Sequence, residues 1–145
     1  MSDQRRGRVG LVDIREEPID VGEVLAGLGD DACGGQAVFI GRVRDHDHGR
    51  GVTTLEYAAH PSAQEKLAAL CAEIATDDEL ISLAAVHRVG SLSVGDIAVV
   101  VAAESAHRDG AFRLTRTLID RLKDEIPIWK HQKFLDGDEE WVGSP

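Results

Sequence analysis

Two adjacent basic residues, His107 and Arg108, stand where a long helix is predicted to begin. Ser105 is a favourable N-cap residue, so the pair falls in the first helical turn. Exposed backbone N–H groups and the helix dipole favour a bound anion there, and the guanidinium of Arg108 adds a charged donor. The pair could therefore hold a phosphate. The alternative, which is commoner at helix starts, is a solvated Arg108 and a His107 that caps or packs locally.

Two lysines, Lys123 and Lys130, lie on either side of Pro127 near the end of the same predicted helix. Two ammonium groups close to each other, or close to Arg44, disfavour each other's charged form. One of the amines would then be a better nucleophile or proton acceptor at neutral pH. The alternative is that Lys123 only complements the negative end of the helix dipole, a frequent arrangement.

A metal site and a reactive thiol have weaker support. His46 and His48 flank Asp47, but no third strong ligand follows at a motif spacing, so a solvated loop is favoured over a metal site. Cys33 and Cys71 lie far apart without further Cys or His at finger spacing, which argues against a disulfide framework and a structural zinc. We expect Cys71 to be inert on an apolar helix stripe, whereas Cys33 beside two glycines could be exposed and reactive.

Length and charge limit the class of protein to which this chain can belong. The 145 residues suit one compact domain, which we place at residues 9–145 after a flexible N-terminus of residues 1–8. With 16 basic and 26 acidic residues the net charge is -10, which argues against nucleic acid and anionic membranes as partners. No apolar run could span a bilayer and no secretory signal is evident, so we expect a soluble cytoplasmic protein. Phosphate-loop, dinucleotide-binding and hydrolase-elbow motifs are absent from the sequence.

The charge is unevenly distributed along the chain. Residues 42–50 carry three arginines against two aspartates, and residues 105–133 carry seven basic against four acidic side chains. These segments hold +1 and +3, so the remainder carries -14. The two basic stretches could meet as a pocket for a small anion. The alternative is that long cations decorate solvated faces.

Hydrophobic periodicity predicts the elements that position these residues. Strands are expected over residues 9–14, 37–44, 52–59, 82–89 and 96–104, and helices from Asp20 through Leu28, after Ser62, and from Ser105 to Pro127. Gly41 suggests a bulge in its strand, and residues 52–59 are expected to return as the partner of residues 37–44. Residues 96–104 are almost wholly apolar, which is typical of a central strand. Strands followed by helices predict a mixed α/β or α+β domain.

Turn and capping signals complete this prediction. Ser62 and Glu65 have capping-box spacing after Pro61, and residues 90–95 have the Gly and Ser content of a turn. The tail after Ile126 is rich in turn residues, with two tryptophans as anchors. The inward stripes of the second and third helices are predicted to comprise Ala63, Leu67, Leu70, Cys71 and Ile74, and Ala111, Thr115, Leu118, Leu122 and Ile126.

Five segments, in this order and spacing, resemble one family. They are FIGRVRDHDHGRGVTTLEY, AVHRVGSLSVGDIAVVV, ESAHRDGAF, LIDRLKDEIPIWK and DGDEEWV. Together they span about residues 14–142 and resemble the large, catalytic subunit of molybdopterin synthase, with the combination of AHR and LKDEIPIWK the most specific part. The resemblance implies an α/β hammerhead fold with a small additional β subdomain. It also implies a homodimer at the centre of a heterotetramer, with a small ubiquitin-like sulfur-carrier subunit docked at each end.

The resemblance implies a reaction as well. Two sulfurs from the carrier's C-terminal Gly-Gly thiocarboxylate enter cyclic pyranopterin monophosphate, a pterin phosphate, and form the dithiolene of molybdopterin. No resident cofactor or metal is implied. By motif position, the catalytic residues are Lys123 and Lys130, and the substrate-binding residues are Phe39, Arg44, His107 and Arg108. Some members of the family continue into a longer, basic C-terminal tail, whereas this chain stops at Pro145.

Three hypotheses remain distinct at this stage. The first is a sulfurtransferase of this type, in which Lys123 and Lys130 serve acyl-thiocarboxylate chemistry or proton transfer. The second is an anion-binding scaffold that engages the carrier without catalysis, against which the retention of both lysines argues. The third is an enzyme with Cys33 as a persulfide carrier, which would work without a thiocarboxylated partner.

Overall fold

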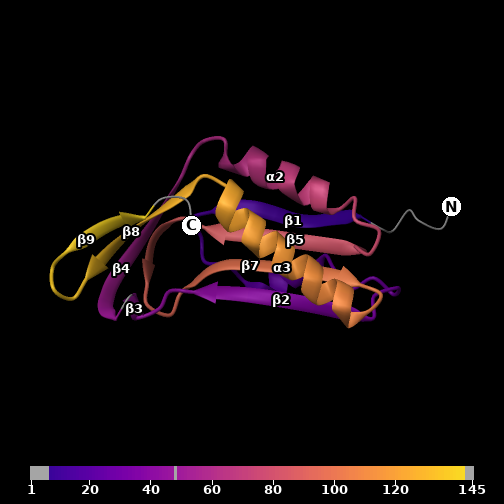
Figure 1. The fold of residues 1–145 in the computed structure, drawn as a ribbon, viewed down its shortest axis with the longest axis horizontal. Helices are drawn as coiled ribbons and strands as arrows, with labels where there is room; N and C mark the ends of the chain where they lie inside the picture. Colours follow the sequence, from indigo (N-terminus) through magenta and orange to yellow (C-terminus); the bar gives the residue numbers. More distant parts are fainter. Residues whose placement is uncertain (1–6, 48, 143–145) are drawn as a thin grey trace.

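The computed structural model describes residues 7–47 and 49–142, which form two sheets and three helices. The strands are β1 (Arg8–Arg15), β2 (Gly35–Arg42), β3 (His46–Asp47), β4 (Arg50–Ala59), β5 (Ser82–Arg88), β6 (Gly90–Ser93), β7 (Ile97–Ser105), β8 (Ile128–Phe134) and β9 (Glu139–Val142). The helices are α1 (Val21–Ala26), α2 (Ala63–Ile74) and α3 (Arg108–Glu125). Figure 1 shows α2 and α3 lying across the first sheet, with the second sheet at one end of the molecule. The predicted mixed α/β fold is confirmed, and the second sheet corresponds to the small β subdomain.

The first sheet has the strand order β1-β5-β7-β2. Its two central strands are buried on both faces, because alternate residues enter different cores. Leu83 and Val101 pack with α2 and α3, whereas Val86 and Val100 pack with Val24 of α1. A strand that is buried on both faces has a nearly continuous apolar sequence, as predicted for β7.

Both predicted helix stripes are buried. Every residue expected on the inward faces of α2 and α3 is buried, so the 3.6-residue period identified the core faces correctly. Asp20 caps α1, as its spacing to Glu23 predicted, whereas the predicted capping bonds of Ser62 and Ser105 are not formed. Ser62 makes no capping bond and instead contacts His60, while Ser105 is the last residue of β7 and leaves His107 as the N-cap of α3.

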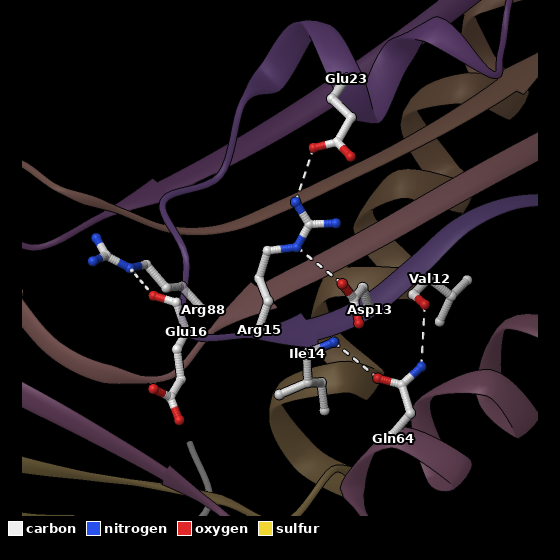
Figure 2. A network of polar contacts seen from close by, with 8 residues as sticks. All are labelled: Val12, Asp13, Ile14, Arg15, Glu16, Glu23, Gln64 and Arg88. Carbon is white, nitrogen blue, oxygen red and sulfur yellow. Dashed lines mark hydrogen bonds and ion pairs between the residues drawn. The ribbon is translucent and has the colours of Figure 1, made fainter.

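The edge strand β1 is fastened to α2 by one side chain. Gln64 accepts a hydrogen bond from the N–H of Ile14 at 2.8 Å and donates to the carbonyl of Val12 at 3.1 Å, as Figure 2 shows. The Gln64 amide thereby supplies hydrogen-bond partners for backbone groups on the open edge of the sheet, where no neighbouring strand is present. Arg8, predicted to lie in a flexible N-terminus, already pairs with Ser82, whereas residues 1–6 lie outside the described residues.

The second sheet corrects the predicted strand pairing. Residues 52–59 belong to β4, which pairs with β3, β6 and β8, while β2 pairs with β7 in the first sheet. The predicted turn at residues 90–95 contains the short strand β6. The register of β2 against β7 shifts after Gly41, which confirms the predicted bulge.

The C-terminal segment, for which only turn residues and two tryptophan anchors were predicted, forms the β8–β9 hairpin. Trp129 and Trp141 are 37% and 62% exposed, so neither anchors the segment in a core. The buried positions are Ile128, Gln132 and Phe134, at the spacing of one face of a strand. Within the described residues, no helix has the length and apolar character needed to cross a bilayer.

Candidate active site

Lys123 and Lys130 interact, as the sequence predicted. Lys123 stands in the last turn of α3, and Lys130 follows the break at Pro127 as the third residue of β8. The pKa of Lys123 lies below its ordinary value, chiefly because the side chain is half-buried and also because of the positive charge of Lys130. Lys123 therefore has more of the unprotonated amine at neutral pH than an exposed lysine has.

Arg44 lies beside Lys130 around a hollow of about 60 Å³. The strand register explains this arrangement, since β4 and β8 pair Tyr57 with Lys130, and both residues line the hollow. The guanidinium of Arg44 is 3.3 Å from Asp47, whose second oxygen accepts a 2.8 Å hydrogen bond from the buried Gln132. The two basic stretches of the sequence thus meet here, which confirms the contact that the charge distribution predicted.

Sequence reasoning missed a histidine beside the lysines. His87, in the central strand β5, is 3% exposed and donates from Nδ1 to the carbonyl of Arg88 at 2.7 Å. Its ring contacts the Tyr57 ring edge-on, with centroids 4.9 Å apart. Burial lowers the pKa of His87 to about 4, and the positive charge of Lys123 acts in the same direction. The imidazole is therefore neutral at physiological pH, with Nε2 as an acceptor. A histidine that directly follows the apolar residues 83–86 of a predicted strand was the signal that could have identified it.

His107 and Arg108 lie at the opposite end of α3 from Lys123. Both are exposed, with His107 in the extended conformation of an N-cap and Arg108 as the first helical residue. The 18 residues of α3 span about 27 Å at 1.5 Å per residue. The fold of one chain therefore keeps this pair away from the two lysines.

Phe39 belongs to a different hollow from Lys130. It lies on the edge strand β2, is 40% exposed, and lines a depression of about 470 Å³ between β2 and α3 together with Phe112 and Thr115. The resemblance implied an aromatic side chain beside the lysines. In one chain Phe39 does not line the hollow that Arg44 and Lys130 form.

The two thiols differ in environment, and both are poor nucleophiles. Burial raises the pKa of Cys71 to about 12, which confirms that it is inert. Cys33 is half-buried, and burial together with the charge of Glu104 raises its pKa. Its Sγ donates to the carbonyl of Gly35 at 3.1 Å. This environment disfavours the thiolate and argues against the persulfide hypothesis.

Residues 7–47 and 49–142 contain no group of three His, Cys, Asp or Glu side chains that could hold a metal ion. His46 instead contacts Asp45 at 2.7 Å. His48, the other half of the metal hypothesis, lies outside the described residues.

Comparison with known proteins gives the family. The model of the family described as "MoaE protein" matches residues 14–125. The chain is 40% identical over 131 residues to the molybdopterin synthase catalytic subunit 1 of Mycobacterium tuberculosis, covering 90% of this chain and 88% of that protein. The crystal structure of molybdopterin synthase from Staphylococcus aureus superimposes with a TM-score of 0.81 at 37% identity, over 90% of this chain and 95% of that chain.

A complex of subunits 1 and 2 of the molybdopterin-converting factor from Helicobacter pylori shares the fold, with a TM-score of 0.70 at 19% identity over 93% of this chain and 90% of that chain. The family match covers most of the chain, and the identity to the mycobacterial subunit extends over nearly the full length of both proteins. The chain therefore belongs to the MoaE family of molybdopterin synthase catalytic subunits, sulfurtransferases of molybdenum cofactor biosynthesis.

Proposed function

We propose that this chain transfers two sulfur atoms from the C-terminal thiocarboxylate of a small ubiquitin-like carrier to cyclic pyranopterin monophosphate, forming the dithiolene of molybdopterin. The observation that carries the proposal is the pair formed by Lys123 and Lys130, in which burial and the neighbouring charge lower the pKa of Lys123. Membership of the MoaE family supports the class of reaction.

The two lysines are assigned the catalytic roles. A neutral Lys123 amine can attack the thiocarboxylate carbonyl, so that a C–N bond forms, the C–S bond breaks, the sulfur leaves as hydrosulfide for the pterin and the nitrogen loses a proton. It can alternatively accept a proton while the thiocarboxylate sulfur attacks the pterin directly. Both roles require the unprotonated form. Arg44 lines the same hollow as Lys130 and carries a permanent positive charge, so it suits an anionic substrate or the thiocarboxylate itself. Its proposed role is to bind substrate.

Two copies of the chain share each site in this proposal. His107 and Arg108 cannot reach the lysines of their own chain along α3, whereas a two-fold dimer can bring the start of one α3 beside the end of the other. The hollow of about 60 Å³ is also far smaller than the 300–1,000 Å³ or so of ordinary ligand sites. Phe39 would then join the lysines as an aromatic contact from a neighbouring chain.

An apolar surface supports the dimer. Strand β2 is the edge of the first sheet, and its residues Val38, Phe39 and Ile40 are all exposed, as is Phe112 on α3. Exposed apolar residues along an unpaired strand edge favour association. The remaining partner is the small carrier subunit with a Gly-Gly C-terminus, in line with the two-subunit Helicobacter pylori complex. The proposed assembly is a heterotetramer with two chains of this protein at its centre, which acts in the cytoplasm; the proposal invokes no nucleic acid, membrane, resident cofactor or metal.

The reaction is tested by incubating the chain with a thiocarboxylated small subunit and the pterin precursor, followed by detection of the dithiolene product. Lys123→Ala should abolish product while the melting temperature stays within a few degrees of wild type, because Lys123 stands at a helix end. Lys133→Ala is the matched control, since Lys133 is exposed on the same strand as Lys130. Wild-type yield from Lys123→Ala would refute the assignment, as would equal losses in both variants.

The shared site is tested by mixing two inactive variants, Arg108→Ala and Lys123→Ala. After random exchange of subunits, half of the dimers are mixed and each has one intact site, so about a quarter of wild-type activity should return. Exchange is verified with differently tagged chains. Continued inactivity after verified exchange, or a fully active monomer, would contradict the shared site.

A further inference from the structure

One carboxylate is buried within the fold close to the start of α3. Glu104 of β7 is 1% exposed, and it accepts hydrogen bonds from the Ser82 hydroxyl at 2.5 Å and the Gln36 amide at 2.9 Å. Both its oxygens also accept from the backbone N–H of Gly29, at 2.8 and 3.0 Å. Burial acts to raise the pKa of Glu104, but the hydrogen bonds outweigh it and the pKa lies below its ordinary value. Glu104 is therefore a buried anion satisfied from several elements.

The hydrogen bond to Gly29 fixes the segment that joins α1 to β2. This segment crosses the end of β7, where the N–H of Gly34 donates to the carbonyl of Ser105 at 3.0 Å. A Cβ atom at Gly34 would overlap the carbonyl oxygen of Ala106. At Gly35, a Cβ would lie 3.2 Å from both Cα and N of Arg108. The segment thus packs directly against the backbone that presents His107 and Arg108.

We propose that Glu104 is a positioning residue for the substrate-binding pair at the start of α3. Its carboxylate holds residues 29–35 in place, and this segment supports the backbone of His107 and Arg108. Glu104 is buried and does not touch the substrate itself. This inference rests on the proposed function of His107 and Arg108.

The chemistry of the network explains why a carboxylate is needed. The backbone N–H of Gly29 and the Gln36 amide can only donate to it, and an apolar side chain would leave both donors without that acceptor in a buried place. A glutamine at this position keeps one carbonyl oxygen that can accept from the Gly29 N–H and the Gln36 amide. Its own NH₂ group can donate to the Ser82 hydroxyl, because a hydroxyl oxygen accepts hydrogen bonds as well as donating them. Glu104→Gln should therefore keep most of the positioning, whereas Glu104→Ala should lose it.

Steady-state kinetics separates positioning from stability. Glu104→Ala should raise KM for the pterin precursor at least tenfold and leave the Kd for the small subunit unchanged. The KM of Glu104→Gln should lie close to the wild-type value. Leu70→Ala, a core variant of α2, serves as a control for lost stability. A wild-type KM in Glu104→Ala, or an equal rise in Leu70→Ala, would overturn the inference.

A second variant keeps the inference testable if Glu104→Ala fails to fold. Gly34→Ala should push the segment away from Ala106 and raise KM in the same way, with Glu104 intact. Gly27→Ala is the matched control, because a Cβ at Gly27 meets nothing within 4 Å. An equal KM for Gly34→Ala and Gly27→Ala would contradict the role of the segment.

Mixing experiments test whether the defect of Glu104→Ala lies at the start of α3 and not at the lysines. Glu104→Ala mixed with Lys123→Ala should recover activity, because the second chain supplies an intact start of α3 to the lysines of the first. Both mixtures are assayed at pterin concentrations far below the raised KM, where Glu104→Ala is nearly inactive. Glu104→Ala mixed with Arg108→Ala should then gain nothing beyond the activity of the separate proteins, because the start of α3 is defective in both chains. Recovery in this second mixture would overturn the inference. If Arg108→Ala and Lys123→Ala fail to complement each other, the shared site itself is wrong.

Discussion

Buried His87 should make this protein lose stability in weak acid. An ordinary histidine has a pKa of 6.5, and burial lowers the pKa of His87 to about 4 in the folded chain. The unfolded chain therefore binds the proton more tightly than the folded chain does. The stability that depends on a neutral His87 is complete above about pH 6.5 and is lost as the pH falls towards 4.

The size of the effect follows from the shift. Each pKa unit corresponds to about 1.4 kcal/mol, so the wild type should lose about 3 kcal/mol through His87 alone between pH 7 and pH 4. That is a large share of the 5–15 kcal/mol or so by which typical domains are stable. Within the described part of the chain, the ring interacts with Tyr57, Lys123 and the Arg88 carbonyl, none of which is an acidic side chain that would stabilise an imidazolium.

Two variants isolate this contribution. His87→Asn keeps a donor for the Arg88 carbonyl, whereas His87→Phe keeps the ring against Tyr57. The two variants should differ from each other in their free energy of unfolding at pH 7. On acidification to pH 4, however, the decrease in that free energy should be about 3 kcal/mol smaller in both variants than in wild type. Urea unfolding, followed by tryptophan fluorescence at one protein concentration, measures the three curves. Parallel loss in all three proteins would refute the reasoning, because they share every carboxylate.

Three further predictions concern the lysines, the core and the thiol. Lys130→Met removes a positive neighbour, so the pKa of Lys123 should rise in an NMR titration of its side chain, which needs no turnover, while an unmoved or lowered pKa would contradict the coupling. Leu118→Ala empties a fully buried position and should cost about 3 kcal/mol in urea unfolding, whereas a loss below about 1 kcal/mol would mean that α3 packs loosely. Cys33→Ser should retain most of the activity with a thiocarboxylated partner, and a complete loss would revive the persulfide hypothesis.

The parts of the fold that could be predicted are those fixed by local periodicity. The apolar runs of β5 and β7 are typical of strands buried on both faces, and the stripe of α3 identifies its buried face through the 3.6-residue period. The grouping of Arg44, Lys123 and Lys130 was accessible for a different reason. Their charges stand out against an acidic chain, and they follow the ends of predicted elements.

Strand pairing could not be predicted in the same way, because it depends on distant contacts. Residues 37–44 and 52–59 follow each other like the strands of a hairpin, yet β2 pairs with β7 and β4 pairs with β8. One available signal was overlooked. Asp136 and Gly137 form an Asp-Gly turn between β8 and β9, and Gly137 has a φ of +91°, a conformation that glycine adopts without strain. Inward polar residues such as Gln132 hid the alternation of β8.

His87 and Glu104 were missed because each is a polar residue near the end of an apolar run. Both lie on strands that are buried on their two faces, where a polar side chain is retained only if hydrogen bonds satisfy it. The sequence shows the polar residue but not its partners. For Glu104 these are Ser82, Gln36 and Gly29, which lie 22, 68 and 75 positions away along the chain.

The charges of α3 run against the preferences of an isolated helix at one end. A helix dipole disfavours a cation at the N-terminus, yet Arg108 is the first residue of α3, and Asp109 compensates for it only in part. A bound phosphate would remove this conflict, since it is favoured by the dipole and by the guanidinium. At the other end the dipole favours the ammonium form of Lys123, so burial and the charge of Lys130 must together exceed this effect to lower the pKa. Both ends thus depart from the most stable arrangement where the proposed chemistry requires it.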